Sequence, residues 1–409
     1  MEYELPSSDD EYDSDEPPPV VINFQELRRR AALAVSRTCT GIRKLTKGRF
    51  HEIFILSFRT SNELNSHNMM LGNGSEKEWS CIARISRQPE PVQKLISEVE
   101  TMEYVRLHTS IPVPEVYRYD FDVGNSVGAQ FILIERKPGQ HLYKIWDKLS
   151  LDHKKVALSE IARVLAELSK LKFEEIGSLT SEMIGPLVYR MGDGQGGEQT
   201  CSGGPFKSTL EYLRYFLNLR TDGTKVFDEV QVILESHLAK LDNSPNVCPP
   251  FRLIHADFDG QNLLFTGGGS TADGHESPPR LSGVIDWEFA YTGPVHFLYK
   301  FPIFIQDSTF NKAAYSDNAI LRPHFVRALR EFFPKGSSDR IELNASIKVD
   351  YILNQYHILF VVLAGGPELE MFKKYALELY VSNVHEGTKD GYYGRDDYSS
   401  DGDVPSDSD

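Results

Sequence analysis

The sequence predicts an α+β protein in two parts, a small β-rich N-terminal lobe and a larger α-helical C-terminal lobe. Between Gly41 and Glu135 the residue pattern indicates three strands, a helix and two further strands, in that order. Beyond Gly139, apolar residues recur at the spacing of long amphipathic helices. The 409 residues, 40% of them hydrophobic, are enough for one large or two medium folded units.

The N-terminal lobe is expected to begin with a helix that precedes the strands. Asn23 is a good N-cap, and strong helix formers follow it to about Arg37, with Arg28 to Arg30 expected on a solvated face. The other elements expected here are strands at 41–46, 51–58, 79–87, 115–119 and 130–135, and a helix that Pro91 opens and that ends near His108.

Long helices and two glycine-rich stretches make up the C-terminal lobe. Helices are expected at 152–171, 207–219, 226–241, 322–333, 345–363 and 369–384. The stretch 192–197 fits G-x-G-x-x-G, but no strand is expected before it and no helix after it, so a surface loop is predicted rather than a dinucleotide site. The stretch 266–279 is expected to link two strands that pair as a hairpin.

The negative charge of the chain is concentrated at its two ends. The first eighteen residues hold eight acids and no base, and residues 386–409 hold eight acids and two bases, so the ends account for nearly all of the net charge of −15. We expect disordered acidic tails at 1–20 and 387–409, an N-terminal helix with the β-rich lobe at 21–138, and the helical lobe at 139–386. A near-neutral body argues against nucleic-acid binding.

Cysteine spacing and hydropathy bear on the cellular compartment. Cys39, Cys81, Cys201 and Cys248 form no C-x-x-C pair, which suits a reducing environment, and we expect them to be buried as small apolar side chains. No apolar run approaches the length of a membrane span, and the acidic start does not resemble a signal peptide. The sequence therefore predicts a cytoplasmic protein with no membrane partner.

The segments 253–265 and 283–288 hold the pattern that indicates chemistry. Asp257 and Asn262 lie five residues apart on a loop, and Asp286 ends the next apolar strand. This order is typical of phosphoryl transfer, in which one acid orients the attacking hydroxyl while an amide oxygen and a second acid hold Mg²⁺ against the phosphates. We predict Asp257 as the catalytic residue, and Asn262 and Asp286 as metal ligands.

Three further residues near this pattern are expected to have structural roles rather than catalytic ones. His255 is expected to hold the loop backbone rather than transfer protons, because two apolar residues place it at a strand end. Asp259 and Glu288 are extra acids near the metal site, and each is expected to face solvent or cap a turn.

With His-x-Asp-x-x-x-x-Asn and Ile-Asp-Trp-Glu, the sequence resembles the aminoglycoside phosphotransferase and choline kinase family, especially its fungal members. The resemblance covers most of 41–384. It implies a two-lobed protein-kinase-like fold, ATP and Mg²⁺ as cofactors, and a small molecule with a hydroxyl group as the phosphate acceptor. GTP stays open as the nucleotide.

The strand at 79–87 and the helix after it are expected to bind the nucleotide. Ile82 and Arg84 share one face of the strand, as an adenine contact and a phosphate-binding cation should. The family's usual cation is lysine, so Arg84 is a variant, and the alternative is a surface arginine. Glu98 falls on the apolar stripe of the next helix, and a carboxylate there needs a cation, so we expect it to pair with Arg84.

Two backbone segments complete the expected nucleotide site. The resemblance implies that Glu135 to Lys137 form a hinge whose backbone binds the purine. The turn around Gly48 could cover the phosphates, although a single glycine is equally typical of an ordinary hairpin turn.

Three functions fit the sequence. The first is an ATP-dependent phosphotransferase. The second is a catalytically weak kinase-like scaffold or ligand-binding protein, which the arginine at the cation position and the missing Gly-rich loop favour. The third, a protein kinase, needs an activation segment after Asp286, where 289–305 is instead apolar and aromatic. The acceptor is not identified by the sequence. Trp287, Tyr291, Tyr351, Tyr356 and several acids could line its pocket, although such residues are equally typical of an ordinary core.

Overall fold

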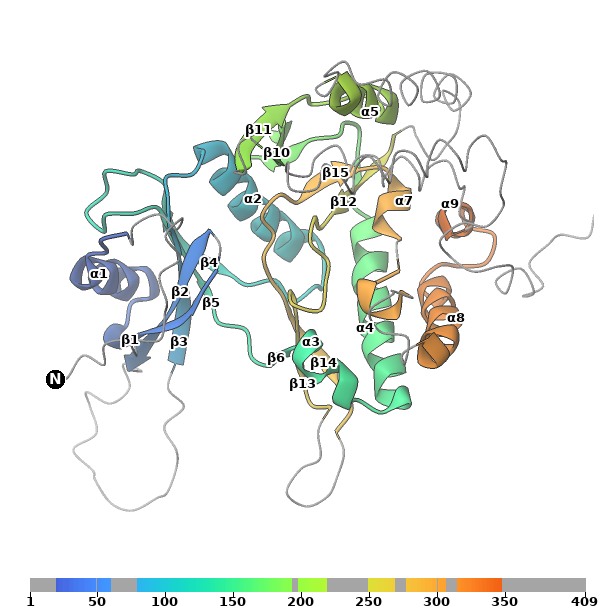
Figure 1. Ribbon diagram of the computed structural model, residues 1–409, viewed down its shortest axis with the longest axis horizontal. Coiled ribbons are helices and arrows are strands. Elements are labelled where there is room, and N and C mark those ends of the chain that lie inside the picture. The colour runs from blue at the N-terminus through green and yellow to red at the C-terminus, as the bar shows by residue number, and fades with distance from the viewer. Residues whose placement is uncertain are drawn as a thin grey trace, which may run out of the picture. The chain divides into compact units, whose positions relative to one another are not determined.

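A computed structural model describes residues 20–48, 50–59, 79–192, 198–218, 249–268, 277–299, 301–306 and 315–347 (Figure 1). Its contacts divide the chain into two compact units. The first comprises residues 1–92 and 115–136, and the second comprises residues 93–114 and 137–409.

The first unit is an antiparallel sheet with a helix on one face (Figure 1). Its elements are α1 Phe24–Val35, β1 Thr38–Lys47, β2 His51–Arg59, β3 Trp79–Ser86, β4 Val116–Asp120 and β5 Phe131–Glu135. The strand order is β1-β2-β3-β5-β4, and every neighbouring pair is antiparallel. The expected helix and five strands are confirmed to within a few residues at each end.

Alternating apolar residues explain why α1 and the sheet pack together. Phe54, Leu56 and Phe58 lie two apart on β2 and point into one core. Leu27 and Ala31, one helical turn apart on α1, are fully buried in the same core. Burying a leucine side chain contributes about 2 kcal/mol, so α1 is part of the folded unit rather than an appendage.

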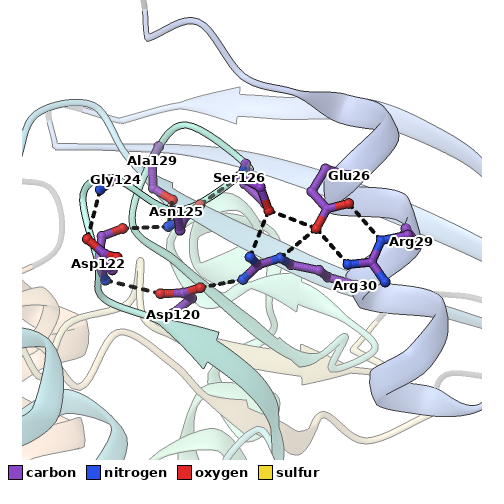
Figure 2. Close-up of polar contacts among 10 residues, drawn as sticks. Glu26, Arg29, Arg30, Asp120, Asp122, Gly124, Asn125, Ser126 and Ala129 are labelled. Atoms are coloured by element: carbon purple, nitrogen blue, oxygen red, sulfur yellow. Dashed lines mark hydrogen bonds and ion pairs between the residues drawn. The ribbon is translucent and has the colours of Figure 1, made fainter.

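Two arginines of α1 take part in a polar network (Figure 2). The expectation of a solvated face is wrong for Arg30, whose side chain is 15% exposed, and is confirmed for Arg29, whose side chain is 60% exposed. Glu26 accepts from Arg29 Nε at 2.7 Å, Arg30 Nε at 3.0 Å and Ser126 Oγ at 2.8 Å. Arg30 also pairs with Asp120 on β4 and donates to Ser126. The network joins α1 to the strand and loop beside it, because Asp120 and Ser126 offer acceptors where the helix docks.

The second unit contains most helices and several short strands (Figure 1). Its helices and turns are α2 Val92–His108, α3 Leu142–Ile145, η2 Trp146–Lys148, α4 Leu151–Ser169, α5 Thr209–Asn218, α7 Val295–Leu298, η3 Ile303–Ile305, α8 Tyr315–Glu331 and α9 Ser338–Ile347. Its strands are β6 Gln140–His141, β7 Lys172–Phe173, β8 Ser178–Thr180, β9 Met183–Gly185, β10 Leu187–Gly192, β11 Glu198–Gly203, β12 Phe251–Ile254, β13 Leu263–Thr266, β14 Arg280–Val284 and β15 Tyr291–Gly293.

Helix α4 is the central helix of this unit. Ser150 caps it by accepting from the backbone N–H of His153 at 3.2 Å. Its apolar stripe, with Leu158, Ile161 and Leu165 buried, packs against α8 and the strands β12 and β14. The strands that carry the candidate site therefore rest on the buried apolar stripe of α4.

Two helices begin at other residues than the sequence predicts. α8 begins at Tyr315, two turns before the expected start, and continues through Pro323. Its first turns are stabilised by Asp317, which pairs with Lys154 of α4 at 2.9 Å, and by the buried Leu321. α9 begins at Ser338, before the start of the helix predicted at 345–363. Residues 348–363 of that prediction, and the helices predicted at 226–241 and 369–384, lie outside the described residues.

The glycine-rich stretch at 192–197 lies between two strands. β10 runs into it and β11 leaves it, and the two pair in register from Leu187–Gly203 to Gly192–Glu198. The expectation that no strand precedes this stretch is therefore wrong. A strand and not a helix follows it, so it lacks the helix N-terminus that a dinucleotide turn needs.

Candidate functional site

A hairpin brings two of the proposed site residues together. β13 pairs with β14 through Leu263 and Val284, as expected from the sequence. Just beyond this pair, the backbone N–H of Ile285 donates to the carbonyl oxygen of Asn262 at 3.0 Å. Asn262 and Asp286 therefore lie at the same end of the hairpin.

The side chains of Gln261 and Asn262 orient Asp257. Asn262 Nδ2 donates to both the backbone oxygen and the Oδ2 of Asp257, each at 2.9 Å. Gln261 Nε2 donates to the same Oδ2 at 2.7 Å. These bonds use Asp257 Oδ2 and the Asn262 amide nitrogen, and they do not involve Asp257 Oδ1 or the Asn262 side-chain oxygen.

His255 has the structural role that the sequence predicted. Its Nδ1 accepts from the backbone N–H of Asp257 at 3.2 Å, and its Nε2 contacts the carbonyl oxygen of Ile285 at 3.0 Å. The two contacts assign the proton to Nε2. Burial lowers the pKa of His255, which keeps the ring neutral at pH 7. The ring thus ties the Asp257 loop to the segment before Asp286.

The turn from Asp286 to Phe289 has an unusual backbone. Asp286 has φ of 64° and Phe289 has φ of 60°, in the left-handed region that side chains of this size rarely adopt. Each such residue costs on the order of 1–3 kcal/mol, and such strain is concentrated at functional sites. Trp287, fully buried, donates from Nε1 to the Val284 oxygen at 3.0 Å and holds the turn.

Glu288 forms a buried ion pair, so the expectation that it faces solvent or caps a turn is wrong. Its Oε2 lies 2.7 Å from Nζ of Lys94 on α2, and the Lys94 side chain is fully buried. Lys94 and Arg190 of β10 each lie 5.1 Å from the centre of the Phe289 ring. The turn that carries Asp286 is therefore anchored to α2 and to β10.

Asp259 caps its own loop, in agreement with the sequence expectation. Its carboxylate accepts from the backbone N–H of Gly260, and its carbonyl oxygen accepts from the N–H of Asn262 at 2.9 Å. The tight turn that results sets the five-residue separation between Asp257 and Asn262.

A pocket of about 500 Å³ opens beside Asp257 within the second unit. Most of the side chains that line it are apolar or aromatic, and Tyr291 is among them, as expected. Trp287 does not line it, because its ring is buried beneath the turn. Tyr351 and Tyr356 lie outside the described residues.

Arg84 is buried in the first unit, which excludes the surface arginine considered as the alternative. It is 8% exposed, and one of its guanidinium nitrogens donates to His51 Nδ1 at 3.1 Å. The other ring nitrogen of His51 lies 3.7 Å from a carboxylate oxygen of Glu90. Ile82, two residues away on β3, is half-buried.

The remaining nucleotide-site candidates lie on several elements. Glu98 on α2 is 2% exposed, as its place on the apolar stripe predicted, and its pairing with Arg84 stays a prediction.

Glu135 ends β5 and accepts from the Glu115 N–H at 3.2 Å. Lys137 packs its side-chain carbons against Gly283, where a Cβ would approach them to 2.9 Å. The N–H of Gly48 donates to the His51 oxygen at 2.8 Å.

Sequence reasoning missed Lys94 and Gln261, although a signal existed for both. Lys94 lies four residues before Glu98, so the same helical stripe that singled out Glu98 also contains it. Gln261 lies next to Asn262 in the loop whose spacing was already recognised. His51 and Arg190 gave no such signal, because their contacts depend on strand pairing.

Among the described residues, no three His, Cys, Asp or Glu side chains cluster in a way that could hold a metal ion. The protein groups at the hairpin end, Asn262 and Asp286, offer an incomplete set of oxygen ligands. Such a set fits Mg²⁺, which commonly takes one or two carboxylates together with substrate phosphates and water.

The fold and the site define an α+β protein of the protein-kinase-like class, with a β-sheet N-terminal unit and a helix-rich second unit. The model of the phosphotransferase enzyme family, APH, matches residues 65–297. The chain belongs to this family, as the resemblance implied.

Curated relatives match only part of the chain and part of their own length. A subtelomeric hrmA-associated cluster protein of Aspergillus fumigatus is 28% identical over 211 residues, which cover 46% of this chain and 38% of that protein. Clavilactone A biosynthesis cluster protein Y of Ampulloclitocybe clavipes is 25% identical over 56% of this chain and 57% of its own. In Candida tropicalis, altered inheritance of mitochondria protein 9, mitochondrial, is 30% identical over 34% of this chain and 21% of its own.

Solved structures resemble the chain in fold. The ternary complex of streptomycin, ATP and APH(2″)-IIa superposes with a TM-score of 0.50, covering 88% of this chain and 97% of that chain at 13% identity. At this identity the likeness shows a shared fold. Within the described ranges, no helix combines the length and the apolar character needed to cross a membrane.

Proposed function

We propose that the chain is a phosphotransferase that moves the γ-phosphate of ATP to a hydroxyl group of a small molecule. The observation that carries this proposal is the Asp257 carboxylate, which Gln261 and Asn262 hold at the wall of a pocket large enough for a small molecule. Family membership supports phosphoryl transfer in general, and the loop geometry supports the specific roles of Asp257 and Asn262.

In the proposed reaction Asp257 aims the acceptor hydroxyl and takes its proton. Its Oδ2 is held by two amide groups, which leaves Oδ1 to accept from the hydroxyl in the pocket. The acceptor oxygen forms a bond to the γ-phosphorus while the bond from that phosphorus to the bridging oxygen breaks. The proton moves to Asp257 Oδ1, and ADP leaves.

The residues placed for the metal and nucleotide have separate roles. Asn262 and Asp286 would hold Mg²⁺, which when bound neutralises charge on the phosphate oxygens. The Lys94–Glu288 pair fixes the turn that carries Asp286. Arg84, with Glu98 as its predicted partner, would hold the α- or β-phosphate, Ile82 would contact the base, and the backbone from Glu135 to Lys137 would bind its edge.

The second candidate is a kinase-like scaffold without turnover, and arginine at the cation position favours it. Arginine is larger than lysine and reaches a phosphate differently. The phosphotransferase is favoured over this scaffold because the chain has Asp257, Asn262 and Asp286, and the positive φ of Asp286 is consistent with a site kept for chemistry.

The domain limits and the location also stay proposals. We retain 21–138 as the N-terminal helix with the kinase-like N-terminal lobe, 139–386 as the helical C-terminal lobe with the catalytic loop, and a cytoplasmic location. The word mitochondrial in the name of the Candida tropicalis relative describes that protein, which matches this chain over 34% of its length.

The test is to incubate the chain with γ-labelled ATP, Mg²⁺ and a metabolite extract, and to identify each species that gains label. The matched control is Asp257→Asn, which preserves the size and polarity of the side chain. Label that appears with the parent chain and not with the control supports the proposal. Equal labelling by both would assign the transfer to another protein or another residue.

A further inference from the structure

In the first unit, the face of β3 that does not carry the α1 core holds a buried cation. Ala83 and Ile85 of β3 point into the α1 core. Arg84 lies between them in the sequence, so its side chain points to the opposite face of the sheet. Arg84 is 8% exposed, and a guanidinium group at that depth needs hydrogen-bond acceptors around it.

His51 supplies one of these acceptors because of the strand register. Ser86 of β3 pairs with His51 of β2, and Arg84 lies two residues before Ser86. His51 is therefore the diagonal cross-strand neighbour of Arg84, at a separation that a long side chain can span. A guanidinium nitrogen of Arg84 donates to His51 Nδ1 at 3.1 Å, and His51 is itself 7% exposed.

The contact with Arg84 determines where the imidazole of His51 carries its proton. A guanidinium group has N–H donors and no acceptor, so Nδ1 accepts and the proton of the neutral ring lies on Nε2. Nε2 lies 3.7 Å from a carboxylate oxygen of Glu90, which attracts this N–H group and orients the ring. Because the partner of the guanidinium is a neutral ring, this contact orients Arg84 without neutralising its charge.

Glu90 is held in place by a buried amide. Gln130, which is 2% exposed, accepts from the Glu90 N–H at 2.7 Å and donates to the Glu90 carbonyl oxygen at 3.0 Å. The backbone oxygen of Gln130 accepts from the N–H of Ser86 at 3.0 Å. Arg84, His51 and Glu90, which we call the Arg84 cluster, are therefore fixed to the sheet at both ends.

The Arg84 cluster lies beside the turn that the sequence offered as a cover for the phosphates. His51 is the first residue of β2, and its carbonyl oxygen accepts from the N–H of Gly48 in that turn at 2.8 Å. Arg87, just after β3, donates from its guanidinium to the Gly48 oxygen at 3.2 Å. The turn and the Arg84 cluster thus belong to the same end of the sheet.

We propose that His51 is a positioning residue for the nucleotide phosphates, because its neutral ring holds the Arg84 guanidinium in the orientation that binds the α- or β-phosphate. Lysine meets a phosphate as a point charge, whereas the planar guanidinium must be oriented toward it. His51 supplies the orientation that a change from lysine to arginine requires. The inference rests on the proposed function, because it takes Arg84 as the phosphate cation.

The first test compares two substitutions of nearly the same shape. Asparagine and leucine side chains have similar size, and asparagine alone has an oxygen that can accept from Arg84 close to the position of Nδ1. We expect His51→Leu to bind Mg²⁺–ATP about tenfold more weakly than the parent, and His51→Asn to stay within about threefold, because one hydrogen bond to a charged group is lost only in the first. Titration calorimetry on the full chain measures both affinities.

Adenosine separates a lost phosphate contact from a distorted sheet. It has the base and ribose of ATP and no phosphate, so its affinity does not depend on Arg84. We expect His51→Leu to bind adenosine as tightly as the parent does. His108→Leu is the control, because His108 on α2 is an exposed histidine, and it should change neither affinity.

A second measurement uses the parent chain and does not require His51→Leu to fold. With isotope-labelled histidine, the nitrogen spectrum should show His51 as the neutral Nε2–H form at pH 7, and His51→Asn assigns its signals by their loss. The Nδ1 signal should move when Mg²⁺–ATP is added, because the guanidinium that donates to Nδ1 then also binds a phosphate. A protonated Nδ1, or an Nδ1 signal that saturating ATP leaves unchanged, would overturn the inference.

The outcomes separate this inference from the proposed function. ATP affinity equal to that of the parent in His51→Leu, or equal losses for ATP and adenosine, would overturn the inference. The expected loss of ATP affinity in a chain that transfers no label would retain the inference and remove the proposed function. Label transfer by a chain whose ATP affinity does not respond to His51→Leu would do the reverse, and a chain that binds no ATP would remove both.

Discussion

At the scale of single residues, the site depends on which oxygen of the Asp257 carboxylate accepts hydrogen bonds from the neighbouring side chains. Gln261 and Asn262 both donate to Oδ2, and His255 fixes the backbone of the same residue. A carboxylate held in this way loses rotational freedom before a substrate arrives, which is the preorganisation that general base catalysis needs. His255 remains neutral and structural.

Replacing Asp257 and Asp286 should separate catalysis from nucleotide binding. Asp257→Asn keeps an oxygen for the two amide donors and removes the base, so we expect ATP affinity near that of the parent and turnover lower by about 10²-fold. Asp286→Asn should weaken binding of Mg²⁺–ATP itself. Calorimetric titration and a turnover assay on both variants make the comparison, and parent-like turnover by Asp257→Asn would remove this loop from the mechanism.

Arg84 provides a second prediction at the same scale. Arg84→Lys should keep part of the ATP affinity, since both side chains carry a positive charge, whereas Arg84→Ala should lose most of it. Because Arg84 is buried and contacts His51, each variant also needs a melting curve without nucleotide. Parent-like ATP binding by a folded Arg84→Ala variant would contradict the role of Arg84 as the phosphate cation.

At the scale of elements, local patterns predicted most of the first unit and tertiary contacts decided the rest. The hairpin of β1 and β2 followed from alternation and turn residues, and in the second unit the limits of α2 followed from its flanking prolines. The start of α8 did not, because the pairing of Asp317 with Lys154 lies outside any local window. The same limit applies to Arg190, since its contact with Phe289 exists only once β10 is placed.

The contacts that hold α1 in place lead to a prediction of how the stability of the protein depends on pH. Arg29 and Arg30 lower the pKa of Glu26, with a further contribution from Ser126. A carboxyl group with a lowered pKa in the folded state adds stability above its unfolded pKa, and that stability is lost as the pH falls toward the folded value. Glu26→Gln should therefore lower the melting temperature at pH 7, and the difference from the parent should shrink as the pH approaches 3.

The control for this prediction is Glu103→Gln, which changes an exposed glutamate on α2. It should leave the melting temperature close to that of the parent at both pH values. A Glu26→Gln effect that stays constant from pH 7 to pH 3 would mean that its cause is packing rather than charge.

At the scale of the whole molecule, the proposed machinery is divided between the two units. Arg84 and Ile82 belong to the first unit, and Asp257, Asn262 and Asp286 belong to the second. Both sets were proposed from a local pattern, a strand face in one and a loop spacing in the other, and their roles stay predictions. The pocket beside Asp257 could not be predicted in this way, since its walls come from segments as distant as Leu165 and Gln306.

Metal-dependent stabilisation by nucleotide is the prediction that belongs to this scale. If Asn262 and Asp286 hold Mg²⁺ only together with phosphate oxygens, ATP should raise the melting temperature with Mg²⁺ present and much less with a chelator. At a hundredfold excess over Kd, binding adds about 2.7 kcal/mol to the folded state, which corresponds to roughly a few degrees for a chain of this size. Asp286→Asn should lose the Mg²⁺-linked part of the shift and keep the melting temperature of the free protein within a few degrees of the parent. An ATP shift of equal size in Mg²⁺ and in chelator would argue for the scaffold, because nucleotide would then bind without the metal that transfer requires.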